Sequence, residues 1–334
     1  MVPLSTKYEL VRLTHALAVC AVDCYALISG YVGLNARHRV SNLIRLWFEV
    51  CFYSVVITAV YYLFRPGPTV AHLLRLSMFP VARDQYWYFT AYFALFFFMP
   101  FLNHLIHTLP RKDARRLLAA LIGVFSVMPT LLFRDLFATR YGYAPVWLGT
   151  LYLLGAYVRK YEPGRSFSKK RLFAWYLGFV LVSWAVRWAI ESFTLHRLGE
   201  MKMGQYLMEY SSPTTLGAAL MLLMLFSGLQ VRQPAVRRFV QFVSPLTFGI
   251  YLIHTQPLVW VQILSKRFAA FADNRALVCI PQILLAATAI YLICAVIDAV
   301  RVQLFRLLRI RDLSDWLQDR LTALWTRVTA RIAI

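Results

Sequence analysis

The sequence of 334 residues contains little charge, few acidic side chains and few cysteines. Charged residues make up 15% of the chain, against about 25% in soluble globular proteins. The five cysteines have neither the loop spacing of a disulfide framework nor the paired spacing of a zinc site. A phosphate-binding Gly-rich loop, a G-x-S-x-G elbow and a zincin motif are also missing. These absences argue against a soluble domain, a metalloenzyme and several common hydrolases.

Long apolar runs dominate what is present: 60% of the residues are hydrophobic and 16% are aromatic. Runs of about 17 to 25 apolar residues suffice to cross a hydrocarbon core, and continuous runs indicate helices rather than barrel strands. The sequence therefore predicts an all-α, polytopic membrane helix bundle. We expect nine spanning helices, at residues 14–34, 46–64, 85–107, 116–132, 143–158, 172–190, 213–229, 244–264 and 277–300.

The net charge of +21 comes in short clusters between these runs, not on a basic polar face, so nucleic acid is not an expected partner. The loops after spans one, three, five and seven, with the C-terminal tail, hold 23 of the 36 Lys and Arg residues. Cytoplasmic loops are enriched in basic residues, so we expect this side and the C-terminus to be cytoplasmic. Nine spans then place the N-terminus outside, where Lys7 and Arg12 would have to cross unaided. A further helix upstream would remove that difficulty.

The chain is expected to divide into a membrane domain, residues 1–300, and a basic amphipathic tail, residues 301–334. From Leu313 onwards apolar residues recur at helical spacing, with Arg320 and Arg327 among the polar positions. Two interpretations remain open for this tail. It lies on the inner leaflet among membrane lipids, or it packs on loops of the protein itself.

Four polar residues inside predicted spans are candidates for a structural or functional role. Asp23, at the middle of the first span, must face the bundle interior, a partner or water, because an unpaired charge there costs about 2.5–3.5 kcal/mol. It is either a polar functional site or a structural hydrogen-bonding residue. Arg187 and Asp298 lie near span ends, where we expect them to reach the interface. His254, halfway along span eight, is either a general base or proton relay, or a structural histidine.

Two clusters at the ends of spans are candidates for binding. Arg37, Arg39 and Arg45 surround the first predicted cytoplasmic loop and suit an anionic cofactor, although any cytoplasmic loop is expected to be basic. On the predicted outer side, residues 83–88 carry Trp87 and Tyr88 among polar neighbours. These aromatics are typical of the interfacial belt and could also hold a sugar ring. His104 and His107 form a weak pair with no third ligand nearby, so no metal is expected.

Three stretches, in order, resemble signatures of acyltransferase family 3, the inner-membrane O-acyltransferases of bacteria. Residues 21–31, AVDCYALISGY, resemble a Val-Asp-x-Phe-Phe-x-x-Ser-Gly-Phe signature that includes Ser29 and Gly30. Residues 85–89, QYWYF, are similar to an aromatic helix opening. Residues 244–254, SPLTFGIYLIH, resemble a Ser-x-x-x-Tyr-Leu-x-His signature ending at His254. The resemblance covers almost the whole chain up to the tail.

The resemblance implies ten membrane helices, a cytoplasmic acyl-CoA co-substrate, probable transfer of acetyl, and a hydroxyl acceptor on a cell-surface glycan. It implies His254 and Arg45 as catalytic residues. The residues implied to bind acyl-CoA are Arg37, Arg39, Arg45, Ser29 and Gly30. Those implied to bind the acceptor are Trp87, Tyr88, Tyr251 and Asp23.

One feature departs from the family pattern. The family's first helix, which carries an arginine and then a histidine, has no counterpart before Asp23, and His15 lies too close to Ser29–Gly30 to replace it. We therefore expect an N-terminally shortened chain whose own activity is in question. Two alternatives follow: a glycan or lipid transporter, disfavoured because no internal repeat is evident, and a non-catalytic membrane subunit.

Overall fold

The computed structural model describes residues 3–65 and 70–332, and this part of the chain is helical, without strands. It divides into two compact units. Unit 1 comprises residues 1–38, 91–230 and 275–280, and unit 2 comprises residues 39–90, 231–274 and 281–334. The all-α class predicted from the sequence is confirmed.

Unit 1 is built around α8 (Pro145–Tyr161), whose residues are buried almost throughout. The helix begins with Pro145 at its first position, where proline costs no hydrogen bond, and ends at Glu162 in a left-handed conformation. It packs against α2 (Ala21–Gly33) and α6 (Arg111–Ile122). The remaining helices are α1 (Thr6–Ala18), α7 (Met128–Leu131), α9 (Lys169–Leu198), α10 (Pro213–Ser227) and most of α5 (Trp87–Thr108).

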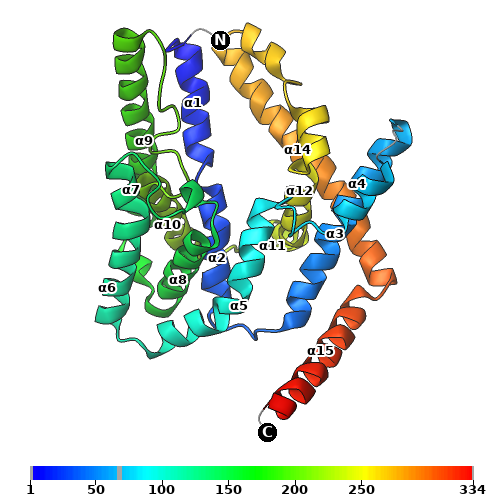
Figure 1. Cartoon of the computed structure of the whole chain (residues 1–334). Helices are drawn as coiled ribbons and strands as arrows, with labels where there is room; N and C mark the ends of the chain where they lie inside the picture. Colours follow the sequence, from blue (N-terminus) through cyan, green and yellow to red (C-terminus); the bar gives the residue numbers. More distant parts are fainter. Residues whose placement is uncertain (1–2, 66–69, 333–334) are drawn as a thin grey trace. The chain divides into compact units, whose positions relative to one another are not determined.

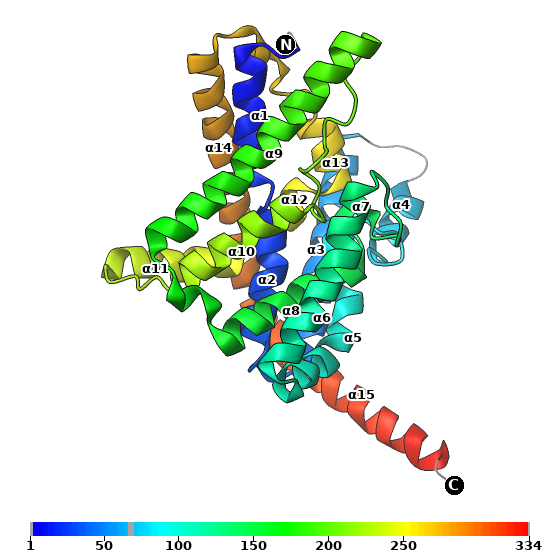
Figure 2. The same ribbon diagram turned by 90° about the vertical axis from the view of Figure 1, so that its left-hand side faces the viewer.

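Two packing layers surround this centre. Helix α10 lies against both α9 and α2, and α1 lies against α9 (Figure 2). Ser168 caps α9 by accepting a hydrogen bond from the Arg171 N–H at 3.3 Å, and Gly199 ends the helix at a φ of 71°. Because it is capped at both ends and unbroken between them, α9 forms one long side of the unit.

Unit 2 contains two long helices, α3 (Val40–Phe64) and α14 (Ala276–Leu307), although the first residues of α14 belong to unit 1. Shorter helices accompany them (Figure 1): α4 (Val70–Ser77), α11 (Pro234–Val243), α12 (Thr247–His254) and α13 (Pro257–Val259). The last helix, α15 (Ile310–Ile332), packs against α3. Helix α14 continues through residue 300 to Leu307, so Arg301 is part of a long helix.

In the described part of the chain, six helices are long and apolar enough to cross a membrane. They match predicted spans one to four, six and nine. The other three predicted spans are shorter or broken. Helices α8 and α10 have 17 and 15 residues, and the predicted span 244–264 is interrupted at Gln256–Pro257. Proline lacks an N–H, and the Gln256 side chain accepts hydrogen bonds from the next two backbone amides, so a new helix begins there.

The first half of the tail helix bears on one of the two interpretations offered above, packing on the protein itself. Near its start, Asp315 pairs with Arg39 at 3.2 Å, and Gln318 accepts a hydrogen bond from the Ser41 N–H at 2.9 Å. Further along, Leu324 and Trp325 are exposed. The first half of α15 therefore packs on the start of α3, and contact of the second half with lipid stays a prediction. The side chains after residue 327 lie outside the described residues.

Candidate functional site

Asp23 is completely buried in α2 of unit 1. Its Oδ1 accepts a hydrogen bond from Trp147 Nε1 of α8 at 3.4 Å. Its Oδ2 has no hydrogen-bonding partner among the described residues. A buried carboxyl group with one unsatisfied oxygen is costly, and such groups are retained mainly where they do chemistry or organise a site. The expectation that Asp23 faces the bundle interior is confirmed.

Ser29 and Gly30 lie where α2 crosses α8. A Cβ atom on Gly30 would overlap the backbone carbonyl of Tyr152, so only glycine fits there. Ser29 donates its hydroxyl hydrogen to the Tyr25 carbonyl oxygen at 2.9 Å, within its own helix. Gly30 therefore has a packing role, and the donor-binding roles predicted for Ser29 and Gly30 stay predictions. The next residue, Tyr31, lines a cavity.

This cavity, of about 370 Å³, lies at the C-terminal end of α8, on the predicted cytoplasmic side. Tyr31, Lys169, Arg165 and Glu162 contribute to its lining, and Arg165 pairs with Glu162 at 2.8 Å, which leaves Lys169 as the cation of the lining outside that pair. Beside it, Arg159 Nη1 donates to the Tyr31 hydroxyl at 3.2 Å, and the guanidinium lies 5.0 Å from the tyrosine ring centroid. Cationic groups around a concave site favour an anionic ligand, and guanidinium groups match phosphate geometry. We name this the inner cavity.

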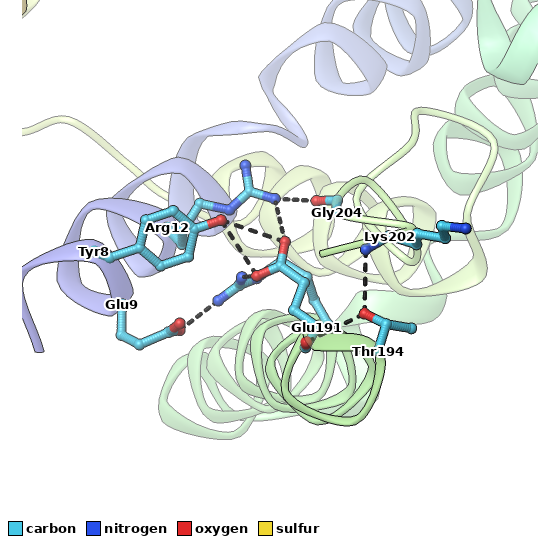
Figure 3. Close-up of polar contacts among 8 residues, drawn as sticks. Tyr8, Glu9, Arg12, Glu191, Thr194, Lys202 and Gly204 are labelled. Carbon is cyan, nitrogen blue, oxygen red and sulfur yellow. Dashed lines mark hydrogen bonds and ion pairs between the residues drawn. The ribbon is translucent and has the colours of Figure 1, made fainter. Parts of the chain in front are cut away.

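A buried ion network joins α1 and α9 (Figure 3). Arg187, fully buried, pairs with Glu9 and with Glu191. Arg12 pairs with Glu191 at 3.4 Å and also donates to the Gly204 carbonyl oxygen. The prediction that Arg187 reaches the interface is wrong, because its charge is compensated inside the protein by carboxylates of two helices.

Unit 2 brings four of the predicted residues together. The rings of Tyr88 and Tyr251 have centroids 6.0 Å apart, and those of Tyr251 and His254 are 6.3 Å apart. Trp87 adjoins Tyr88 at the start of α5, with ring centroids 5.5 Å apart. His254 ends α12 and is half-buried. These residues form one aromatic cluster, made by the first residues of α5 and the last turn of α12.

The two nitrogens of the His254 ring are in different surroundings. Nδ1 lies 2.6 Å from the Ile250 carbonyl oxygen, which can only accept a hydrogen bond. In a neutral imidazole Nδ1 then carries the hydrogen, and Nε2 keeps its lone pair. The backbone thereby fixes the tautomer that a general base requires.

A polar cavity of about 270 Å³ lies in the same unit, on the predicted outer side. Arg83, Asp84 and Gln85 line it from the loop before α5, and Gln256 lines it from the break after His254. The Ser54 hydroxyl donates to Gln85 Oε1 at 2.8 Å, which fixes the amide. Mixed donors and acceptors of this kind suit a neutral, hydroxyl-rich ligand.

The family model for an acyltransferase domain, Acyl_transf_3, matches residues 3–299. The chain belongs to acyltransferase family 3. Neither a curated protein nor a solved structure matches it. The six long apolar helices agree with a membrane acyltransferase, and the resemblance drawn from the three sequence stretches is confirmed.

Within this acyltransferase the boundary between the two units falls in the first predicted cytoplasmic loop. Arg37 belongs to unit 1, and Arg39 and Arg45 belong to unit 2. All three are exposed. Arg39 pairs with Asp315 of α15, and Arg45 Nη2 donates to Asn42 Oδ1 at 2.5 Å within α3. The roles predicted for these arginines stay predictions.

A second buried ion network holds unit 2 of the acyltransferase together. Arg301 donates to Asp298 Oδ2 at 2.8 Å and to Glu49 Oε1 at 2.9 Å, and Tyr53 donates to Asp298 Oδ1 at 2.7 Å. Asp298 has no exposed surface. The prediction that Asp298 reaches the interface is therefore wrong, since Arg301 of its own helix and Tyr53 of α3 are its partners inside the protein.

Sequence reasoning missed several residues of this acyltransferase. Glu9 and Glu191 were not singled out, although acidic residues near long apolar runs should have signalled buried pairs. Tyr31 directly follows the Ser-Gly signature, which was a usable signal. Arg301 was assigned to the tail by its position after an apolar run. In the described part of the chain no three His, Cys, Asp or Glu side chains gather as a metal site.

Proposed function

We propose that this membrane acyltransferase moves an acyl group, in the simplest case acetyl, from cytoplasmic acyl-CoA to a hydroxyl group of an extracytoplasmic glycan. The bacterial inner membrane is the proposed location. Family membership supplies acyl transfer at a membrane. The observation that carries the finer proposal is the inner cavity, which Tyr31, Lys169 and the Arg165–Glu162 ion pair line and beside which Arg159 bonds to Tyr31, in a protein of that family.

The inner cavity supports the choice of acyl-CoA as donor. Coenzyme A carries phosphate groups, which cations bind by charge-assisted hydrogen bonds. Arg165 and Lys169 are exposed, so they are accessible to a ligand from water. Arg37, Arg39 and Arg45 remain proposed contacts of the donor, as the family resemblance implies. Ser29 and Gly30 contribute by placing Tyr31 at the cavity.

The polar cavity of unit 2 supports a glycan acceptor. It offers the Gln85 and Gln256 amides, Asp84 and Arg83. Sugar hydroxyls both donate and accept hydrogen bonds, so they match such a lining. Trp87, Tyr88 and Tyr251 supply aromatic faces nearby along the chain, and Asp23 stays a proposed polar residue of the path in unit 1.

His254 is the proposed general base. Its Nε2 takes the proton of the acceptor hydroxyl while the hydroxyl oxygen forms a bond to the acyl carbon. The carbon–sulfur bond of the thioester breaks, and coenzyme A leaves as a thiolate that takes up a proton. Arg45 is proposed to balance the negative charge of the donor. Each step conserves atoms and electrons, and no metal is needed.

The test uses the purified chain in lipid nanodiscs with acetyl-CoA and a set of bacterial cell-surface glycans. Radiolabelled acetyl transferred to glycan and free thiol released from CoA are measured together. We expect His254→Gln to lower transfer by about 10²–10⁴-fold. His196→Gln, which changes an exposed histidine at the end of α9, is the control. A chain that neither binds coenzyme A nor transfers acetyl to any glycan contradicts the proposal.

A further inference from the structure

A second cavity on the predicted outer side belongs to unit 1 and lies beyond the start of α8. It has a volume of about 200 Å³ and is formed by the segment before α8, residues 129–141, and the segment before α10, residues 203–212. We name it the loop cavity. Its volume lies below the range of about 300–1,000 Å³ for drug-sized ligands, so it suits one small ring.

Aromatic side chains form one wall of the loop cavity. The rings of Phe133 and Tyr206 are stacked, with centroids 4.9 Å apart and planes inclined by 19°. Phe133 and Tyr141 are 60% and 46% exposed. Exposed aromatics near a span end are typical of an interfacial belt. Here, however, the rings face a cavity that also holds charged and amide groups.

Polar side chains complete the lining. Glu209, Arg134 and Gln205 reach the loop cavity from both segments. Glu209 has no ion-pair partner within residues 3–65 and 70–332, and burial together with the negative charge of Asp135 raises its pKa to about 7. A carboxyl group held beside an aromatic wall offers the acceptor that a sugar hydroxyl needs. Arg134 and Gln205 offer donors.

Several hydrogen bonds anchor the two segments to one another and to the helices. The Ser211 N–H donates to the Tyr141 carbonyl oxygen at 3.3 Å, and the Tyr206 hydroxyl donates to the Thr130 carbonyl oxygen at 3.2 Å. The buried network between α1 and α9 also anchors the start of the segment 203–212, because Arg12 of that network donates to the Gly204 carbonyl oxygen (Figure 3). Ordering the lining before a ligand arrives reduces the entropy lost on binding.

Four residues of the lining have backbone conformations that non-glycine residues avoid. Phe133, Tyr141, Met203 and Leu207 have φ between 53° and 59°. Such conformations are unfavourable and persist where the surroundings fix them, which is common at binding sites.

We propose that the loop cavity binds one neutral sugar ring, with the ring face against Phe133 and Tyr206 and its hydroxyls on Glu209, Arg134 and Gln205. The inference rests on the proposed function for its meaning, because the bound sugar would be part of the glycan acceptor.

The experiment measures binding, without acyl transfer. Saturation-transfer difference NMR on the purified chain in nanodiscs uses methyl glycosides of glucose, galactose, mannose and N-acetylglucosamine as probes. We expect at least one glycoside to bind, and Phe133→Ala or Glu209→Gln to weaken that binding at least fivefold. Phe133→Tyr keeps an aromatic ring and should restore it, which separates ring loss from misfolding.

Matched controls come from the same segments. Phe137→Ala removes another exposed phenylalanine, 41% accessible, that contacts Phe125 and not the loop cavity. Glu200→Gln removes an exposed carboxylate that pairs with Lys202. Both variants should bind as the unchanged chain does. Equal losses in Phe137→Ala and Phe133→Ala would indicate an interfacial belt and overturn the inference.

The outcomes separate this inference from the proposed function. No binding by any glycoside overturns the inference, whatever the acetyl-CoA assay gives. Glycoside binding that depends on Phe133 and Glu209 supports it. If such binding occurs while coenzyme A is neither bound nor consumed, the loop cavity stands and the acyl-CoA part of the proposed function fails.

Discussion

Gly30 of α2 and Gly155 of α8 face each other across the crossing of the two helices. A Cβ atom on Gly30 would overlap the carbonyl oxygen of Tyr152, and one on Gly155 would overlap that of Leu27. The two glycines thus let the backbones approach to a distance that no other residue allows, as small residues do in membrane helix pairs. Asp23 and Tyr31 lie on the same helix on either side of this contact.

Gly30→Ala should therefore destabilise unit 1. Forcing the helices apart costs about 1–3 kcal/mol in a packed core. The measurement is thermal unfolding in detergent, followed by thiol accessibility of the buried Cys20. Ser29→Ala is the control, because the Ser29 hydroxyl bonds only within its own helix among the described residues. Equal melting temperatures for Gly30→Ala and the unchanged chain would contradict the close crossing.

The buried network around Arg301 gives a second prediction. Arg301→Met leaves the Asp298 and Glu49 carboxylates without their cation. Removing one partner of a buried pair costs about 3–5 kcal/mol. We expect a large drop in the melting temperature of the purified protein. Arg306→Met changes an exposed arginine on the same helix that bonds to Gln303, and it should melt within error of the unchanged chain. A small effect of Arg301→Met would mean that Asp298 is satisfied in another way.

The sequence predicts the helical class and the placement of several groups for good physical reasons. Continuous apolar runs have no other stable form in lipid, so six spans are located correctly. The cost of a charge in the bilayer correctly predicts that Asp23 lies in the interior of the protein. The same reasoning fails for Arg187 and Asp298. Each has one partner on its own helix, Glu191 four residues on and Arg301 three residues on, and that spacing could have been read from the sequence. Their other partners, Glu9 and Tyr53, are 178 and 245 residues away along the chain, and a pattern along one helix contains no information on them.

The candidate site was predictable only in part. The signature ending at His254 indicated the histidine, but the bond from its Nδ1 to the Ile250 carbonyl depends on the helix geometry. The apolar composition of residues 244–264 also predicted one continuous span there. The chain breaks after His254, where the Gln256 side chain caps the next helix. The loop cavity had no signal at all, because its two segments are separated by α8 and α9.

Arg45 provides a prediction about activity. It is exposed near the start of α3 and bonds to Asn42 of the same helix. Because Arg45 is a proposed contact of the donor, the substitution Arg45→Ala should abolish acetyl transfer and leave membrane insertion intact. The measurements are radiolabelled transfer and protease protection of the inserted chain. Arg116→Ala, an exposed arginine on the same predicted side that pairs with Asp113, is the control. Unchanged transfer in Arg45→Ala would remove Arg45 from the site.

Glu209 gives a prediction about pH. Burial and the charge of Asp135 raise its pKa to about 7, from an ordinary value of about 4.5. Between these two values the folded state holds a proton that the unfolded state has lost. Stability from this group is therefore complete below about pH 4.5 and disappears as the pH rises towards 7. Glu209→Gln carries no titrating group, so its melting temperature relative to the unchanged chain should increase from pH 5 to pH 8.

The comparison uses melting curves of both proteins in nanodiscs at half-unit pH steps. Glu200→Gln serves as the reference, because Glu200 is exposed and its replacement should give a difference that is nearly independent of pH. The unchanged chain and Glu209→Gln share every other titrating group, so only Glu209 and the groups it influences, Asp135 and Tyr206, contribute to the difference. Parallel curves for the two proteins would show that the Glu209 carboxyl group is solvated, and the polar wall assigned to the loop cavity would then be absent.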